Sequence, residues 1–138
     1  MRKPIIAGNW KMFKTVTEAV SLVREMISDL CAVSEVERVL CPPFTSLSLI
    51  AELVKGTDLK VGAQNMHWED QGAFTGEVSP LMVKELCHYV IIGHSERRQY
   101  FGETDESVNR KVKTALKHGL IPIVCVGENL AQNEAGLT

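Results

Sequence analysis

The chain has 138 residues, of which 45% are hydrophobic and 23% are charged, a composition typical of one compact domain spanning residues 1–138. Its 15 Lys and Arg residues nearly balance its 17 Asp and Glu residues, which argues against a nucleic-acid partner or binding to an anionic membrane. No apolar run reaches the length that spans a bilayer, and the N-terminus lacks the apolar core of a signal peptide, so we expect a cytoplasmic protein.

Short apolar segments rich in β-branched residues alternate along the chain with segments of helical periodicity. The expected strands are 4–7, 36–41, 59–63, 89–92 and 121–126. Because these segments are apolar on both faces, they are typical of a parallel sheet that is covered on both sides.

Four amphipathic helices are expected between these strands. The first follows the capping-box pattern of Thr15 and Glu18, and the third has Ser79 at its N-cap and Pro80 at its first position. The second helix includes Leu47, Ile50 and Val54 and ends at Gly56. The fourth starts at Thr104 and ends before Gly119, and its apolar face comprises Val108, Val112, Ala115 and Leu116.

This alternation predicts an α/β architecture with a parallel sheet, either an open doubly wound sheet or a closed barrel. Segment 128–138 starts what would be a helix too short to cover the fifth strand. A strand left bare on one face is expected to be unstable or to recruit a partner. A complete eightfold barrel takes about 250 residues, so the chain would form about half of one.

The four cysteines lie far apart and form no Cys-x-x-Cys pair. Their spacing indicates neither a disulfide framework nor a metal site. We therefore expect each of them to be a small buried apolar residue: Cys31, Cys41, Cys87 and Cys125.

Polar residues that follow the strands are candidates for function, because ligands of parallel α/β proteins bind at the carboxyl ends of the strands. They are Asn9 and Lys11 after the first strand, Gln64 and Asn65 after the third, His94, Ser95 and Glu96 after the fourth, and Glu128 after the fifth.

Lys11 and His94 are the two residues of this set most suited to chemistry. Lys11 offers a point positive charge for an anionic group or a developing oxyanion; alternatively it is a solvated surface lysine. His94 precedes a short polar stretch that would place it near the positive end of a helical turn, where a neutral imidazole is favoured. The alternative for His94 is a structural histidine, the interpretation we also give to His67, His88 and His118.

Segment 64–79 carries no strand or helix signal, although it contains Trp68 and Phe74 and two glycines. Loops of this length in compact folds are usually functional or disordered, and the aromatic residues argue against disorder. We expect the loop to dock into another subunit, the alternative being an ordinary surface loop.

At these same positions the sequence resembles the triosephosphate isomerase family. Five segments are similar to successive family signatures in order and spacing: AGNWKM (7–12), GAQN (62–65), GAFTGEVS (72–79), IGHSERR (92–98) and CVGE (125–128). The resemblance covers the whole chain and implies a partial (βα)8 barrel with strands 1–5 and helices 1–4.

The resemblance also implies an activity and residue roles. The family interconverts dihydroxyacetone phosphate and glyceraldehyde 3-phosphate, in glycolysis and gluconeogenesis, without a metal or an organic cofactor. By resemblance, Asn9 and Lys11 would bind substrate, and His94 would be the neutral electrophile. Glu96 would hold the Lys11 ammonium, and Ser95 would be a supporting group. Loop 64–79 would be the dimer loop of a homodimer, with its tip at Phe74, Thr75 and Gly76, and Thr75 would reach toward Asn9 and Lys11 of the other subunit.

Two family features have no counterpart here. The family's general base is a glutamate followed by proline, but none of the five prolines of this chain follows a glutamate, and the phosphate-binding Gly-Gly pair is also missing. Removing a positioned base typically costs ~10²–10⁴-fold in rate, so the chain alone is expected to be inactive. Its base, with strands six to eight, would come from the missing C-terminal half of the barrel.

Two other hypotheses remain open. The chain could be a non-catalytic association module, in which the exposed fifth strand and loop 64–79 pair with other copies. It could also belong to another phosphate-handling barrel enzyme, which would require a different set of polar residues at the strand ends.

Overall fold

The computed structural model describes residues 3–136 and contains one five-stranded parallel sheet. The strands are hydrogen-bonded in chain order, from β1 to β5. They are β1 (Ile5–Asn9), β2 (Glu37–Cys41), β3 (Lys60–Ala63), β4 (Tyr89–Ile92) and β5 (Ile121–Val124). The expected strands are thus confirmed, with β1 ending two residues later and β5 two residues earlier than the pattern indicated.

The helices of the described residues are α1 (Val16–Cys31), α2 (Leu47–Leu53), α3 (Pro80–Leu86), α4 (Ser95–Phe101), α5 (Asp105–Lys117) and α6 (Leu130–Glu134), with a 3-10 turn at Phe44–Ser46. The capping box of α1 is confirmed, because the Thr15 amide donates to Glu18 Oε2 at 2.8 Å and the Glu18 amide donates to Thr15 Oγ1 at 3.4 Å. Ser79 caps α3 as expected, with Pro80 at the first helical position.

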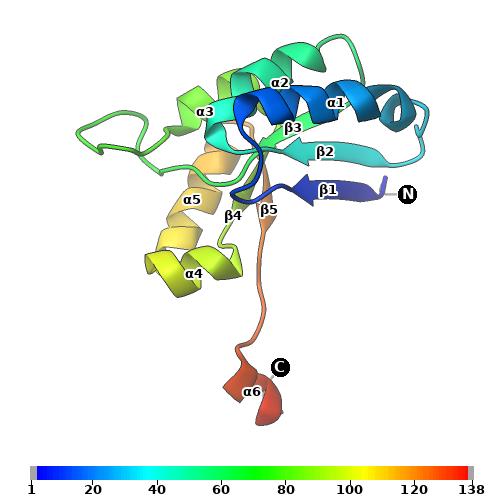
Figure 1. Cartoon of the computed structure of the whole chain (residues 1–138). Helices are drawn as coiled ribbons and strands as arrows, with labels where there is room; N and C mark the ends of the chain where they lie inside the picture. The colour runs from blue at the N-terminus through cyan, green and yellow to red at the C-terminus, as the bar shows by residue number, and fades with distance from the viewer. Residues whose placement is uncertain (1–2, 137–138) are drawn as a thin grey trace.

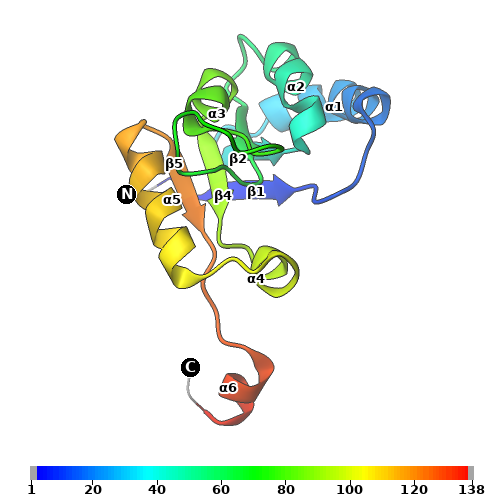
Figure 2. The same cartoon turned by 90° about the vertical axis from the view of Figure 1, so that its left-hand side faces the viewer.

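The strand order decides between the two architectures that periodicity left open. Parallel strands are joined by right-handed crossovers, so an order that never reverses places every connecting helix on the same face of the sheet. A doubly wound sheet reverses its order instead. Figure 1 shows α1, α2, α3 and α5 outside a sheet that curls from β1 to β5, and Figure 2 shows the same curl from the side. The fold is therefore a partial barrel.

Apolar residues fill both sides of this curled sheet. The larger cluster lies between the sheet and its helices and includes Val23, Leu40, Ile50, Val61, Val90 and Ile92. The smaller cluster lies on the inner face and comprises Val39, Cys41, Tyr89 and Ile91, with Ile123 and Cys125 beside it. Gly62 allows the close approach on the inner face, because a Cβ there would lie 2.9 Å from Cys41 Sγ.

Two expectations about burial were wrong in part. Leu116 is 61% exposed, and the buried stripe of α5 instead runs through Val108, Lys111 and Ala115, the i, i+3, i+7 positions of one helix face. Among the cysteines, Cys41 and Cys87 are buried, but two are half-buried. Cys31 is the last residue of α1, and Cys125 lies beyond the end of β5, where little of the described chain covers it.

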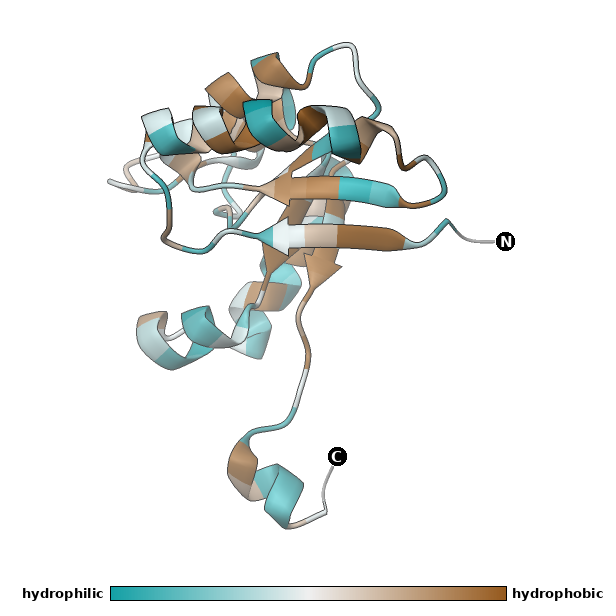
Figure 3. Cartoon of the chain, turned by 45° about the vertical axis from the view of Figure 1, so that its right-hand side comes forward, coloured by the Kyte–Doolittle hydropathy of each residue, from teal (hydrophilic) through white to brown (hydrophobic). Residues whose placement is uncertain are grey.

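Both edge strands of the sheet expose apolar side chains, as expected for the fifth strand. The exposed fractions are 51% for Ile5, 63% for Ile6, 49% for Ile121 and 40% for Val124. Figure 3 shows hydrophobic residues on uncovered β1, and α6 lies away from the sheet at the end of an extended segment. The last two residues of the expected terminal segment are outside the described residues.

Within residues 3–136, no helix has the length and hydropathy needed to cross a membrane.

Candidate active site

A cleft of about 270 Å³ opens at the carboxyl ends of β1, β3 and β4. The structure brings six of the candidate residues into it: Asn9, Lys11, Gln64, Asn65, His94 and Glu96. The other lining residues are Met12, Pro43, Phe44, Arg97 and Phe101. The cleft therefore combines an ammonium, an imidazole, a carboxylate and amides with apolar walls.

The backbone of Lys11 is held in an unusual conformation by its neighbours. Its φ of 53° lies in the left-handed region, which costs free energy for a residue other than glycine. The Lys11 amide donates to Asn9 Oδ1 at 3.0 Å. Gln64 Nε2 donates to the Lys11 carbonyl at 2.9 Å and to the Cys41 carbonyl at 2.8 Å. Gln64 was a strand-end candidate without an assigned role, and only the fold shows that it holds Lys11. We call its two hydrogen bonds, to the Lys11 and Cys41 carbonyls, the Gln64 clamp.

Glu96 holds the side chain of Lys11. The Nζ of Lys11 lies 2.7 Å from Glu96 Oε1, and this hydrogen bond, together with the charge of Lys11, lowers the pKa of the Glu96 carboxyl below its usual value. Both side chains are about half exposed, at 48% and 40%. The ammonium is thus placed at the cleft while still accessible to a ligand.

His94 is the N-cap of α4, as its sequence position indicated. Its Nδ1 accepts a hydrogen bond from the Glu96 amide at 3.2 Å. The nearest Glu96 carboxylate oxygen is 3.5 Å from Nδ1, too far for a hydrogen bond, so the amide is the partner that fixes the ring. A nitrogen that accepts a hydrogen bond carries no hydrogen itself. In the neutral ring the hydrogen is therefore on Nε2, which can act as a donor. Gly93 makes the turn before His94 possible, with a φ of 74°.

The remaining candidates lie elsewhere. Ser95 is exposed and lines a separate hollow with Arg98, Cys125 and Glu128. The loop tip of Phe74, Thr75 and Gly76 is exposed and does not line the cleft of its own chain. Segment 64–79 is confirmed as a long connection without helix or strand.

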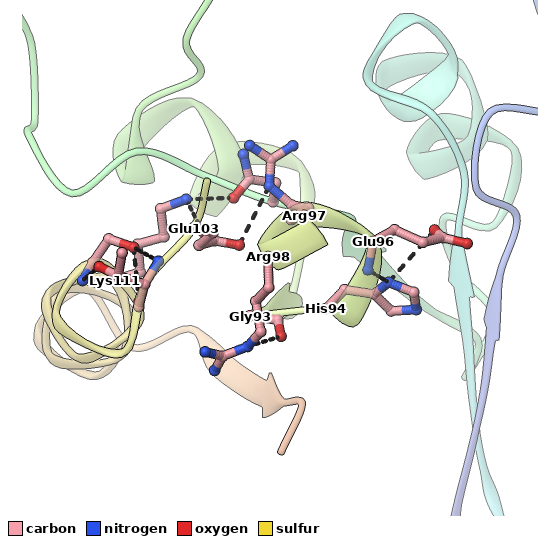
Figure 4. Close-up of polar contacts among 10 residues, drawn as sticks. Gly93, His94, Glu96, Arg97, Arg98, Glu103 and Lys111 are labelled. Carbon is pink, nitrogen blue, oxygen red and sulfur yellow. Dashed lines mark hydrogen bonds and ion pairs between the residues drawn. The ribbon is translucent and has the colours of Figure 1, made fainter. Parts of the chain in front are cut away.

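A buried polar cluster adjoins the cleft, and two of its members, Asn65 and Arg97, also line it. The sequence indicated Asn65 but not the cluster. Lys111 pairs with Glu103 and donates to Asn65 Oδ1 at 2.9 Å, and Arg97 Nε lies 3.4 Å from Glu103 Oε2 (Figure 4). The cluster joins α5, the end of β3 and α4, the helix that His94 caps. The available signal was a lysine on the apolar stripe of α5, between Val108 and Ala115.

The fold and the cleft define a protein of the (βα)8-barrel class, of which this chain contains five strands. The sheet is parallel and sequential, its helices lie outside it, and a polar cleft opens at its carboxyl edge. The family model described as triosephosphate isomerase matches residues 4–138. The chain therefore belongs to the triosephosphate isomerase family.

Individual relatives agree with this assignment. The triosephosphate isomerase of Chloroflexus aurantiacus is 61% identical over 137 residues, which cover 99% of this chain and 55% of that protein. That of Caldanaerobacter subterraneus subsp. tengcongensis is 60% identical over 139 residues, covering 100% of this chain and 56% of the relative. The crystal structure of triosephosphate isomerase from Bartonella henselae superposes with a TM-score of 0.91 at 38% identity, covering 98% of this chain and 56% of that one. The chain thus spans about half the length of these relatives.

Proposed function

We propose that this chain provides the N-terminal part of a triosephosphate isomerase, which interconverts dihydroxyacetone phosphate and glyceraldehyde 3-phosphate. The observation that supports this most is the meeting of Lys11, His94 and Glu96 at one cleft beside the end of β1. A triose phosphate needs a cation for its phosphate and a donor for its carbonyl oxygen, and this cleft offers both.

Each residue has a proposed role that its position in the cleft supports. The Lys11 ammonium attracts the phosphate and the negative charge that develops on the substrate oxygen. Asn9 uses its Oδ1 to hold the Lys11 amide, which leaves its Nδ2 to donate to substrate. The Nε2–H of His94 donates to the carbonyl oxygen and stabilises the enediolate without first becoming a cation. Glu96 positions both residues.

The carbon-bound proton must be removed by a base from the region that the longer relatives have and this chain does not span. We define the completing segment as the part of the Chloroflexus aurantiacus relative that follows its match to this chain. We expect no measurable turnover from the chain alone and isomerase activity from the chain folded together with the completing segment.

A coupled isomerase assay on both samples tests this proposal. In the complemented sample, Lys11→Met should lower kcat/KM by at least about 100-fold, since it removes a charged partner of the transition state. Lys55→Met is the matched control, because Lys55 is an exposed lysine just after α2 and does not line the cleft. A complex that copurifies but shows no activity would contradict the proposal.

We also propose that the protein is a homodimer that associates through loop 64–79. The loop tip is ordered by its own contacts: the Phe74 ring packs 4.4 Å from the His67 ring, and a Cβ at Gly72 would lie 2.5 Å from Phe74. Phe74 is nevertheless 44% exposed, and Thr75 and Gly76 are exposed. An ordered tip with an exposed aromatic ring is typical of an interface.

Sedimentation of the complemented sample tests this second point. Thr75→Arg should raise the dimer dissociation constant at least about tenfold, because it places a long charged side chain at the tip. Gln71→Arg, at an exposed position before the tip, is the control. A wild-type monomer at micromolar concentration would contradict the dimer.

The exposed edges favour one alternative function, a non-catalytic module that associates through β1 and β5. The apolar side chains of Ile5, Ile6, Ile121 and Val124 support it. Sedimentation of the chain alone distinguishes the isomerase from the association module. Discrete oligomers that stay intact when the completing segment is added favour the module, and a well-behaved monomer contradicts it.

A further inference from the structure

Helix α5 runs alongside the first half of loop 64–79 and contacts it at successive turns. Arg110, Thr114 and His118 are spaced by four residues, a spacing that aligns side chains along one stripe of a helix. His118 is the C-cap that follows the last helical residue. The mechanism proposed above uses none of these three residues.

Arg110 and Thr114 both contact Trp68, and His118 contacts Asp70. The Arg110 guanidinium lies 5.6 Å from the centre of the Trp68 ring. Thr114 Oγ1 donates to the Trp68 carbonyl at 3.3 Å. His118 Nε2 lies 2.7 Å from Asp70 Oδ1. The first two residues of the stripe hold Trp68, and the third, His118, holds Asp70, which lies nearer the tip.

Asp70 marks the point where the loop leaves the body of the protein. Residues 65–67 are buried, whereas residues 71–77 are all exposed. The base of the loop is closed by the hydrogen bond from the His67 amide to the Val78 carbonyl, at 2.8 Å. Asp70 is therefore the last residue before the exposed segment that hydrogen-bonds to the end of α5, and Phe74 adds a contact within the loop, to the His67 ring.

The His118 side chain is mostly buried, at 14% exposed, while Asp70 is 43% exposed. A fully exposed ion pair contributes little to stability, because both side chains lose entropy and solvent screens the charges. Here one partner is already fixed by burial at the end of α5, so pairing restricts mainly the loop residue.

We infer that His118 and Asp70 form a pin through which α5 fixes the direction of segment 71–77, which contains the loop tip, and this makes His118 a positioning residue for the loop. The effect of this pin on dimer formation rests on the proposed dimer through loop 64–79. Thr114 and Arg110 hold Trp68 one turn and two turns earlier and keep the loop base against the helix.

Hydrogen exchange measured by mass spectrometry on the chain with its completing segment tests the pin. In His118→Ala and in Asp70→Ala, the amide of Glu77 should exchange about fivefold to tenfold faster in peptides covering residues 71–77, the factor expected for one lost hydrogen bond. Within the described residues it is the one amide of this segment that donates a hydrogen bond, to the Phe74 carbonyl at 3.0 Å. The double variant should be no faster than either single variant, because both remove the same contact. Asp70→Asn should restore exchange to within about twofold of wild type, since it keeps an acceptor oxygen for His118.

The control is His88→Ala, because His88 is an exposed histidine after α3 and its imidazole forms no hydrogen bond within residues 3–136. Peptides covering β4 report on the core. Unchanged exchange at 71–77 overturns the pin, and so does an equal increase in the β4 peptides, which would indicate general destabilisation.

Sedimentation of the same variants separates this inference from the proposed dimer. If both stand, the dimer dissociation constant rises about fivefold to tenfold in His118→Ala and Asp70→Ala and recovers in Asp70→Asn. Faster exchange at 71–77 with unchanged association leaves the pin in place and contradicts dimerisation through the loop.

Discussion

At the scale of single residues, Lys11 depends on three other side chains. Its amide is held by Asn9, its carbonyl by Gln64 and its ammonium by Glu96. A lysine with a φ of 53° is strained, and such a conformation persists only where the surroundings hold it. The position of the ammonium is therefore a property of the assembled strand ends.

Gln64→Glu should expose this dependence. The carboxylate cannot donate to the carbonyls of Lys11 and Cys41, so both lose a partner and face a negative charge instead. We expect the free energy of unfolding to fall by about 1–3 kcal/mol and activity of the complemented sample to fall with it. Urea unfolding measures the first effect, with Gln71→Glu at an exposed loop position as the control. Equal stability of the two variants would show that the clamp contributes nothing.

The cysteines should differ in reactivity. Burial raises the pKa of the Cys41 and Cys87 thiols to about 12, so almost no thiolate forms at pH 8. Cys31 and Cys125 are half-buried and more accessible. We expect iodoacetamide to modify these two at least about tenfold faster, as followed by peptide mass spectrometry. In urea the four rates should converge, and early labelling of Cys41 in the native protein would contradict the burial of the inner face.

At the scale of elements, α5 links the core to the site. Its buried stripe includes Lys111, which pairs with Glu103 and donates to Asn65, and these contacts tie α5 to β3 and to the segment after α4. A buried ion pair need not stabilise a fold more than apolar residues would, but breaking one leaves an uncompensated charge.

Lys111→Met should therefore be strongly destabilising. The Glu103 side chain is only 3% exposed, and its one remaining charged partner would be Arg97, whose Nε lies 3.4 Å from Glu103 Oε2. We expect a loss of about 3–5 kcal/mol in the free energy of unfolding, measured in urea. Lys113→Met, at an exposed position of the same helix, should change stability by less than about 0.5 kcal/mol. Adding Glu103→Gln to Lys111→Met should recover part of the loss, because it removes the buried charge; an additive loss would contradict this explanation.

At the scale of the whole molecule, the two sheet edges are the dominant feature. Strands β1 and β5 each have a free edge and exposed apolar side chains, so within the described residues the inner face of the sheet stays open. Barrels avoid this situation by closure, which leaves no edge unpaired.

Ile6→Lys should weaken assembly with the completing segment. Ile6 is 63% exposed. Its register partner on β2 is Arg38, and both side chains lie on the outward face of the sheet, the face that Leu40 also occupies. A lysine there would be buried without a partner once the edge is covered. We expect at least about a tenfold loss of affinity for the completing segment in a titration followed by sedimentation. Val33→Lys is the control, at a 44% exposed position after α1, and equal affinity of both variants would show that β1 is not covered in the complex.

The sequence by itself determined the elements of this protein. Strands and helices follow from local patterns: the capping box at Thr15 and Glu18, the Ser79-Pro80 start of α3, and the fully apolar segment Tyr89–Ile92. Family signatures in register then indicated Asn9, Lys11, His94 and Glu96, and the structure brings these four residues into one cleft. Their catalytic roles stay predictions.

Only the tertiary structure decided how these parts depend on one another. The strand order settled a barrel-like sheet over a doubly wound one, because periodicity reports burial but not which strands are neighbours. The Gln64 clamp, the Lys111–Glu103 pair and the His118–Asp70 contact join residues 53, 8 and 48 positions apart. Polar partners of this kind leave no periodic signal, since a hydrogen bond needs only that two atoms meet, and in this chain the curl of the sheet and the packing of α5 bring them together.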